Sequence, residues 1–449
     1  MISRRQFLGT VAAGAVVRPA QGSAFQTVAL RTHEWFGDKI EEFFFPAEWR
    51  VTVQHMKGYL TPPLDADAIR ESILHPVGTK SLREIAAGKT TVAIAFDDLT
   101  RPTPTYEIVP HVVAELRAAG IRDENILFVT GYGAHYQMNG MEVEKKLGEE
   151  AVRHHPWINH NIWENLADLG TTRARNQILV NTYYHKADVK ITLSGLKAHG
   201  TPGYGGGPKL VLPGLSGMKT IRYMHLEIKR APRPDKGPDG IPIFRMWENE
   251  QRQDMIEAAR KVGVDYSVQT VYNQDRRPVH VVAGDIVEAH HQAARYAVNH
   301  LATEYARQAD IVVVNAYPKG SQLHEHFHWG TQGLKDGGSI VVINQNPMGE
   351  FAWHYLDEAG FNHGGSYFAQ RNARKRRFPQ ARQVLLYSQY LQARELDHPN
   401  FPPEAVGVRS WDEVLERLRR EHRGDTEVAI YPYAGIQHEI AKLDLPENV

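Results

Sequence analysis

The chain has 449 residues, 42% hydrophobic and 23% charged, as in an ordinary globular protein, and this length predicts about two or three domains. Lysine plus arginine equals aspartate plus glutamate at 52 each, so no bulk charge favours binding to nucleic acid or to an acidic membrane. Because there is no cysteine, disulfides and thiolate metal sites are excluded, and any metal must be held by His, Asp, Glu, Lys or a cofactor's own atoms.

The first 24 residues are typical of an export signal. Arg4 and Arg5 precede a short apolar run, Phe7–Val17, and small residues lead to a cleavage point predicted after Ala24. The letters SRRQFL resemble the twin-arginine signal, which is read as an address rather than as an anchor. We therefore expect a periplasmic protein carried by the export machinery for folded proteins. Beyond the signal, no apolar run approaches the roughly 20 residues that a membrane helix needs.

From about residue 90, apolar strand-like runs alternate with helix-like segments. The predicted strands are Thr91–Phe96, Asn125–Thr130, Asp188–Leu193, Val279–Ala283, Asp310–Val314, Ser339–Ile343 and Val384–Tyr387. The clearest predicted helices are Glu107–Ala119, Ile286–Arg307 and Trp411–Arg420. This alternation predicts an α/β protein with two mainly parallel sheets flanked by helices. We expect two domains after the signal, 25–295 and 296–449, with a more β-like stretch at the start of the first.

Polar residues follow the first two predicted strands. In open α/β sheets, ligands bind beyond the carboxyl ends of the strands, so these residues are candidates for a site. Asp98 and Arg101 lie in the letters DDLTRPTP, and the planar guanidinium suits a carboxylate or a phosphate. His135 lies in the letters GYGAHY, and its ordinary pKa near neutrality suits a proton carrier.

A glycine-rich stretch follows the third predicted strand and reads HGTPGYGGGPK from His199 to Lys209. Glycines allow backbone amides to approach a bound group closely. A Walker phosphate loop needs Gly directly before its lysine and Ser or Thr directly after it. Here Pro208 and Leu210 occupy those positions, which disfavours nucleotide hydrolysis of that kind.

A second candidate metal site follows the strand predicted at Asp310–Val314. The letters HEHFH, from His324 to His328, satisfy the H-E-x-x-H pattern of zinc proteases, with Glu325 as the base. Glycines bracket this stretch closely and a five-residue pattern recurs by chance in a chain with 23 histidines. The pattern therefore stays an alternative.

Taken together, these stretches resemble the nickel-pincer-nucleotide lactate racemase family. The resemblance lies in DDLTRPTP, in the glycine-histidine turn, in the glycine-rich block with its ten-residue spacing from His199 to Lys209, and in a histidine 16 residues further on, His225. It spans roughly residues 28–449 and is most specific in the glycine-rich block. Members of this family are two-domain α/β proteins, and the resemblance implies an active site in the cleft between a cofactor-binding domain and a substrate-side domain.

The resemblance also implies roles by position. Lys209 matches the lysine that holds the cofactor, a nickel pyridinium-3,5-bisthiocarboxylic acid mononucleotide, through a thioamide bond, and His225 matches the protein ligand to nickel. His135 and His199 match the two acid–base histidines, and Asp98 and Arg101 match positions beside the site and the substrate. The remaining cofactor-binding positions are Tyr204, Gly205, Gly206 and Gly207.

Cofactor carbon and sulfur atoms together with an imidazole form a donor set that suits Ni(II) in a plane. The cofactor's ring would accept hydride from the carbinol carbon while a histidine takes the hydroxyl proton, and a second histidine on the other face would allow inversion. The expected activity is thus that of an isomerase, a racemase or epimerase.

The chain departs from the family pattern where lactate racemases carry a glutamine and a lysine for the substrate carboxylate. Glu325 and His328 stand there, and Tyr136 replaces an arginine that is common beside the histidine turn. A carboxylate at this position would repel another carboxylate but accept hydrogen bonds from hydroxyls. A sugar acid, another substituted 2-hydroxy acid or a sugar is therefore expected in place of lactate. Two alternatives remain open, a zinc hydrolase and a non-catalytic periplasmic binding protein.

Overall fold

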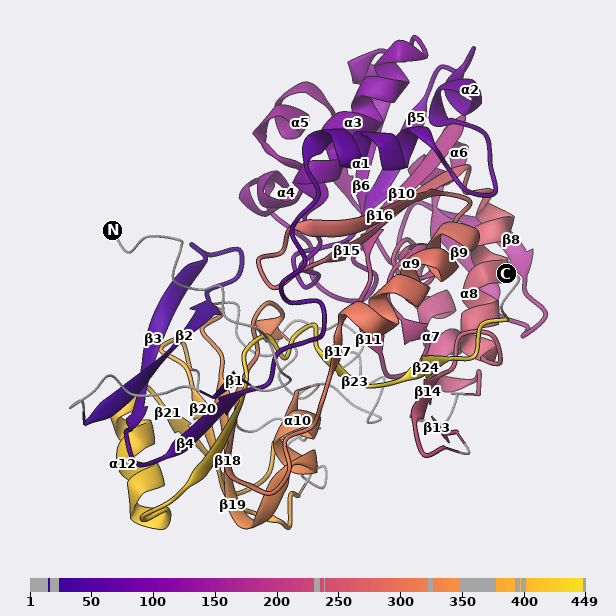
Figure 1. The fold of residues 1–449 in the computed structure, drawn as a ribbon. Helices are drawn as coiled ribbons and strands as arrows, with labels where there is room; N and C mark the ends of the chain where they lie inside the picture. Colours follow the sequence, from indigo (N-terminus) through magenta and orange to yellow (C-terminus); the bar gives the residue numbers. More distant parts are fainter. Residues whose placement is uncertain are drawn as a thin grey trace. The chain divides into compact units, whose positions relative to one another are not determined.

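The computed structural model describes residues 15–16, 24–229, 235–237, 239–321, 326–347, 377–391, 396 and 401–446. The chain divides into two compact units (Figure 1). The terminal unit contains the described residues of Met1–Lys57, Thr303–Glu350 and Arg374–Glu439, and the central unit contains those of Gly58–Ala302 and Ile440–Val449.

The central unit is built on a six-stranded sheet in the order β16-β15-β10-β5-β6-β7. Its strands are β5 (Val92–Phe96), β6 (Ile126–Thr130), β7 (Trp157–Asn159), β10 (Val189–Gly195), β15 (Tyr266–Tyr272) and β16 (Pro278–Gly284). Neighbouring strands pair in parallel except β15 and β16, which are antiparallel. Every residue of β5 and β15 is buried, as expected of strands that are covered on both faces.

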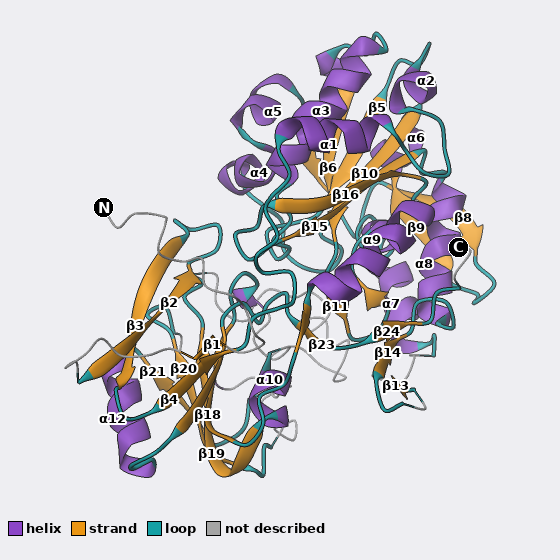
Figure 2. Ribbon diagram, in the orientation of Figure 1, coloured by secondary structure: helices purple, strands orange, loops and turns teal. Residues whose placement is uncertain are grey.

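Helices pack around this sheet (Figure 2). They are α1 (Ala66–Leu74), α2 (Leu82–Ala86), α3 (Thr105–Ala118), α4 (Gly140–Leu147), α5 (Glu149–His154), α6 (Thr182–Lys186), α7 (Met218–Leu226), α8 (Glu250–Val262) and α9 (Glu288–His300). A capping box starts α4, because Asn139 accepts the amide of Glu142 and the Glu142 carboxylate accepts the amide of Asn139. Both α1 and α9 contact the edge strand β16.

Short strands complete the central unit. They are β8 (Leu166–Thr171), β9 (Gln177–Asn181), β11 (Ala198–His199), β12 (Gly203–Tyr204), β13 (Asp235–Lys236), β14 (Pro242–Phe244) and β24 (Lys442–Leu443). Because β24 pairs in parallel with β14, the end of the described chain belongs to this unit.

The terminal unit has a seven-stranded sheet in the order β1-β4-β22-β18-β19-β20-β21, parallel throughout except for β1. Its strands are β1 (Ala15–Val16), β4 (Arg50–Val53), β18 (Ala309–Asn315), β19 (Leu334–Ile343), β20 (Ala381–Tyr387), β21 (Ala405–Val408) and β22 (Glu427–Tyr431). The other elements are the hairpin β2 (Phe25–Thr32) with β3 (Lys39–Pro46), and helices α10 (Phe327–Gln332) and α12 (Trp411–Glu421). Strand β17 (Ala302–Thr303), which contains the last residue of the central unit's segment Gly58–Ala302 and the first residue after it, pairs with β23 (His438–Glu439).

The two mainly parallel sheets flanked by helices confirm the predicted α/β fold class. The helix predicted over Ile286–Arg307 is shorter than expected, because the chain after His300 pairs as β17 with β23. The division of the chain also differs from the expected 25–295 and 296–449. Residues 24–57 join the terminal unit because β4 pairs with β22 and the hairpin packs into that unit's core.

Candidate active site

A small cavity of about 40 Å³ lies in the central unit where β5, β6 and β10 end. Parallel strands present their carboxyl ends at one edge, so residues far apart in the sequence meet there. Five of the residues selected from the sequence line this cavity: Asp98, Arg101, His135, Gly206 and Lys209.

Asp98 and His135 form a buried pair in the cavity wall. Nδ1 of His135 lies 2.8 Å from Oδ2 of Asp98, and the amide of Thr100 donates to Oδ1 at 2.7 Å. Burial opposes ionisation of Asp98, but His135, Arg101 and the hydrogen bond from Thr100 outweigh it and hold the pKa of the carboxyl below its usual range. Asp98 is therefore a carboxylate that accepts a proton-bearing Nδ1 and leaves Nε2 of a neutral His135 as the basic nitrogen.

The pKa of the His135 imidazole lies below its usual value. Burial is the main cause, Asp98 opposes the shift, and the positive charges of Arg101 and Lys209 add to it. His135 is consequently neutral near pH 7 and can accept a proton there.

Arg101 supplies the positive charge of the cavity. Nη1 of Arg101 donates to Oγ1 of Thr100 at 2.7 Å, which orients the guanidinium. Within the described part of the chain Arg101 forms no ion pair. A carboxylate in the cavity could therefore be bound by this guanidinium.

A buried ion pair that the sequence reasoning missed fixes this loop. Nζ of Lys146, on α4, lies 2.6 Å from Oδ1 of Asp97 and also donates to the carbonyl oxygens of Arg101 and Thr103 at 3.1 and 3.0 Å. The other carboxylate oxygen of Asp97 accepts from Thr103 Oγ1 and from the amide of Gly195. The side chain of Lys146 is fully buried. The only signal in the sequence was the doubled aspartate at a strand end.

The glycine-rich stretch forms a short hairpin, β11 with β12, followed by a 3-10 helix, Gly207–Leu210, that carries Lys209 to the cavity. Gly206 and Gly207 have φ of 77° and 56°, a conformation that favours glycine. His199 is half-buried on β11, and its Nδ1 accepts a hydrogen bond from the amide of Thr201 at 3.4 Å. His199 does not line the cavity.

The other predicted cofactor-binding residues of the stretch do not line the cavity. Tyr204 is fully buried, and its ring packs edge-on against Phe244 with centroids 5.6 Å apart. The carbonyl oxygen of Gly205 accepts a hydrogen bond from His290. These two residues, like Gly207, are not among the lining residues and support the loop through packing and backbone contacts.

His225 is on α7, outside the lining of the cavity. Its Nδ1 donates to the carbonyl oxygen of Ile221 at 2.8 Å, which leaves Nε2 as the nitrogen with metal-binding chemistry. Over the described ranges, no three His, Asp or Glu side chains converge as a metal site.

The HEHFH stretch is described only in part, since His324 and Glu325 lie outside the described residues. His326 is buried and hydrogen-bonds through Nε2 to the carbonyl oxygen of Lys319 at 3.0 Å. His328 is half-buried on α10, with its ring 4.9 Å from that of Trp329. The zinc pattern and the substrate roles of Glu325 and His328 stay predictions.

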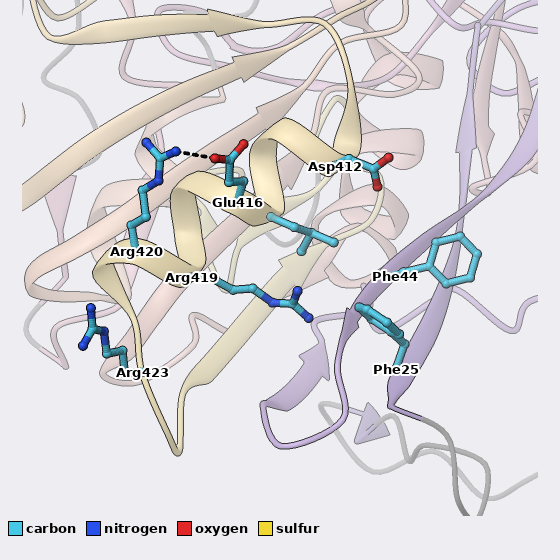
Figure 3. A pocket seen from close by; sticks show the side chains of 8 residues that line it. Phe25, Phe44, Asp412, Glu416, Arg419, Arg420 and Arg423 are labelled. Carbon is cyan, nitrogen blue, oxygen red and sulfur yellow. Dashed lines mark hydrogen bonds and ion pairs between the residues drawn. The ribbon is translucent and has the colours of Figure 1, made fainter.

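A larger hollow of about 610 Å³ lies in the terminal unit between α12 and the β2–β3 hairpin (Figure 3). Phe25 and Phe44 form one side and arginines of α12 the other, with Arg419 over the ring of Phe25. None of the residues selected from the sequence lines it.

The predicted export signal falls almost wholly outside the described residues, apart from Ala15, Val16 and Ala24. No helix in the described ranges is long and apolar enough to cross a membrane.

Comparison with solved structures supports the fold. The lactate racemase apoprotein of Thermoanaerobacterium thermosaccharolyticum superposes with a TM-score of 0.64 at 20% identity, over 92% of this chain and 99% of that one. A protein from Thermotoga maritima superposes with a TM-score of 0.60 at 18% identity, over 86% and 100% of the two chains.

Sequence comparison points the same way. Residues 36–237 match the lactate racemase N-terminal domain. Lactate racemases of Thermoanaerobacterium thermosaccharolyticum and Lactiplantibacillus plantarum are 28% and 26% identical over 62% of this chain, and the match spans 65% and 66% of their own lengths. The chain thus spans slightly less than two thirds of the length of these curated relatives. Residues 36–237 thus match a lactate racemase domain, and the chain is similar to lactate racemases in sequence and in fold.

Proposed function

We propose that the protein is a racemase or epimerase that inverts a carbinol carbon of a 2-hydroxy acid or sugar acid, with a nickel-pincer nucleotide attached to Lys209. One observation carries this proposal: the same cavity at the strand ends contains His135, Arg101 and Lys209. The cavity thus brings together a base, His135, a cation that can bind a carboxylate, Arg101, and the attachment point for the cofactor, Lys209.

Each of the chain's own residues at the site has a separate proposed role. Arg101 binds the substrate carboxylate, and Nε2 of the neutral His135 takes the hydroxyl proton while Asp98 stabilises the charge that develops on the ring. His199 is the proposed acid–base group for the opposite face. When bound, the cofactor supplies the carbon that accepts hydride. His225, through Nε2, is the proposed protein ligand to its nickel.

We propose a substrate with hydroxyls beyond the reacting one, because Glu325 and His328 replace residues that hold a carboxylate in lactate racemases. The twin-arginine-type signal supports export of the loaded, folded protein to the periplasm, because a tethered cofactor is not lost during transport.

The test uses protein from the native host. Metal content and visible absorbance are measured, and the holo-protein is then offered 2-hydroxy acids, sugar acids and sugars while configuration at the carbinol carbon is followed. We expect nickel, a chromophore and inversion of a sugar acid or substituted hydroxy acid. Zinc alone would favour the hydrolase, and a Lys209→Ala variant that still carried the cofactor would refute the attachment.

A further inference from the structure

Two buried basic side chains hold the loop Pro202–Gly207, and none of the roles above explains them. Arg252 on α8 donates from Nε and Nη2 to the carbonyl oxygen of Pro202 at 3.1 and 2.9 Å, and from Nη2 also to that of Tyr204. His290 on α9 lies with Nε2 2.8 Å from the carbonyl oxygen of Gly205. The two helices thereby fix three carbonyl groups of this loop.

The charge of Arg252 is costly where it lies. The residue is fully buried, no described carboxylate lies within ion-pair distance of it, and its Nη1 has no hydrogen-bond partner among the described residues. Burial lowers the pKa of the guanidinium to about 9, so it remains a cation at neutral pH. A buried cation without a counter-ion destabilises a fold relative to an apolar side chain of similar size. Stability alone therefore does not account for an arginine here.

The opposite side of the same loop is fixed as well. The amide of Gly207 donates to Oγ of Ser194 at 3.0 Å and to Oε1 of Gln269 at 2.9 Å. A Cβ at Gly207 would lie 2.6 Å from the His290 ring, so the backbone is packed directly on that side chain. The amide of Lys209 in turn donates to the carbonyl oxygen of Gly206. The course of the backbone up to Lys209 thus depends on the loop.

We propose that Arg252 is a positioning residue that holds the glycine-rich loop so that Lys209 reaches the cavity in the geometry required for the cofactor. This inference rests on the proposed function, because it assigns Arg252 a part in keeping the cofactor on the chain. A guanidinium can bridge two carbonyl oxygens with charge-assisted hydrogen bonds, which an apolar side chain cannot do.

The test is an Arg252→Met variant produced in the native host beside the wild-type chain. Nickel per folded chain after desalting and the mass added to the denatured chain are measured, together with the midpoint of thermal unfolding. We expect nickel and added mass to fall by about tenfold or more, since small misplacements of reacting groups have effects of this size. The unfolding midpoint should change little, because removal of the uncompensated buried charge offsets the loss of the hydrogen bonds to Pro202 and Tyr204. A purely structural arginine would give the reverse: a lower midpoint with unchanged nickel per folded chain.

The matched control is Arg260→Met. Arg260 lies on the same helix, is half-exposed and pairs with Asp285, so its replacement should leave the nickel content unchanged. Wild-type nickel content in the Arg252→Met variant, or an equal loss in both variants, would overturn the inference. If the Arg252→Met variant does not fold, Arg252→Lys is measured in the same assay. Lysine keeps the positive charge but cannot donate to both carbonyl oxygens with the planar geometry of a guanidinium. Reduced nickel per folded chain supports the role, and unchanged nickel refutes it.

A failure of the proposed function would look different, because the wild-type chain itself would then hold no nickel. In that case the rates of amide hydrogen exchange at residues 203–207 are compared in the cofactor-free chains. Faster exchange in Arg252→Met than in Arg260→Met supports the positioning role, and equal exchange overturns it.

Discussion

Asp98 and His135 illustrate how residue chemistry depends on neighbours. Separately, an aspartate after a strand and a histidine in a loop are common, and each is more often structural than catalytic. In the cavity they hydrogen-bond at 2.8 Å, and the carboxylate selects which nitrogen of the ring is basic. The function proposed for His135 therefore requires Asp98.

Asp98→Asn should reduce kcat by roughly 100-fold or more, in the range that general acid–base catalysis contributes. An amide cannot stabilise an imidazolium as a carboxylate does, and it no longer selects the tautomer. The measurement is the initial rate on the substrate identified by the screen, with circular dichroism to confirm folding. A rate within threefold of the wild type (roughly 0.7 kcal/mol) would remove His135 from its proposed role.

The pH profile tests the charges around His135. Because burial and the positive charge of Arg101 lower its pKa, the acidic limb of kcat/KM should lie below the ordinary histidine pKa of 6.5. Removing the cation in Arg101→Gln should raise the pKa of His135 and move the limb to higher pH. The same substitution at Arg277, an arginine paired with Glu107 at the surface, should leave the limb in place. A limb that moves in neither variant, or equally in both, would contradict this assignment.

At the scale of elements, the cavity is formed by the loops at the ends of β-strands and by the 3-10 helix that carries Lys209, and α4 supports one of these loops. The loop after β5 carries Asp97, Asp98 and Arg101, and α4 brings Lys146 beneath it. A buried pair of opposite charges contributes little net stability, but removing one partner leaves the other uncompensated.

Lys146→Met should lower the free energy of unfolding by roughly 3–5 kcal/mol, because it leaves the Asp97 carboxylate buried without its partner. Chemical denaturation followed by tryptophan fluorescence measures this change. The neighbouring, less buried Lys145 provides the control, and Lys145→Met should have a far smaller effect. Adding Asp97→Asn to Lys146→Met should recover part of the loss. Additive losses in the double variant would show that the two side chains act independently.

At the scale of the whole molecule, several histidines are buried in a neutral state. Burial lowers the pKa of His160, His291 and His300 to about 4, and that of His290 well below its usual value. In the unfolded chain each would have the ordinary value near 6.5. At pH values between about 4 and 6.5, the unfolded state therefore binds more protons than the folded state.

This difference predicts acid sensitivity. Since the folded pKa values are lowered, the stabilising contribution is present above pH 6.5 and is lost as the pH falls from about 6.5 towards 4. The denaturant midpoint, measured at half-unit pH steps, should fall over this window. In His160→Asn the decline should be shallower, because one titrating group is gone. A midpoint constant between pH 6.5 and 4 would contradict the buried neutral histidines.

Sequence by itself determined the fold class and five lining residues of the cavity. Apolar runs of β5, β6, β10, β18, β19 and β20 stand out because strands covered on both faces bury nearly every side chain. The site residues stand out because parallel strands deliver the residues after them to one edge. The glycine-rich stretch is visible since left-handed backbone conformations and close packing both require glycine.

Only the tertiary structure decided which distant residues complete this arrangement. The pairing of β4 with β22 assigns the first strands to the terminal unit, and hydrogen bonds between strands leave no local signal in the sequence. In the sequence, Lys146 and Arg252 look like ordinary basic residues on helices. Only the folded structure shows that Lys146 pairs with Asp97 and that Arg252 donates to backbone carbonyl oxygens. Desolvation and partner geometry are properties of the folded chain, and they set the charges on which the proposed chemistry depends.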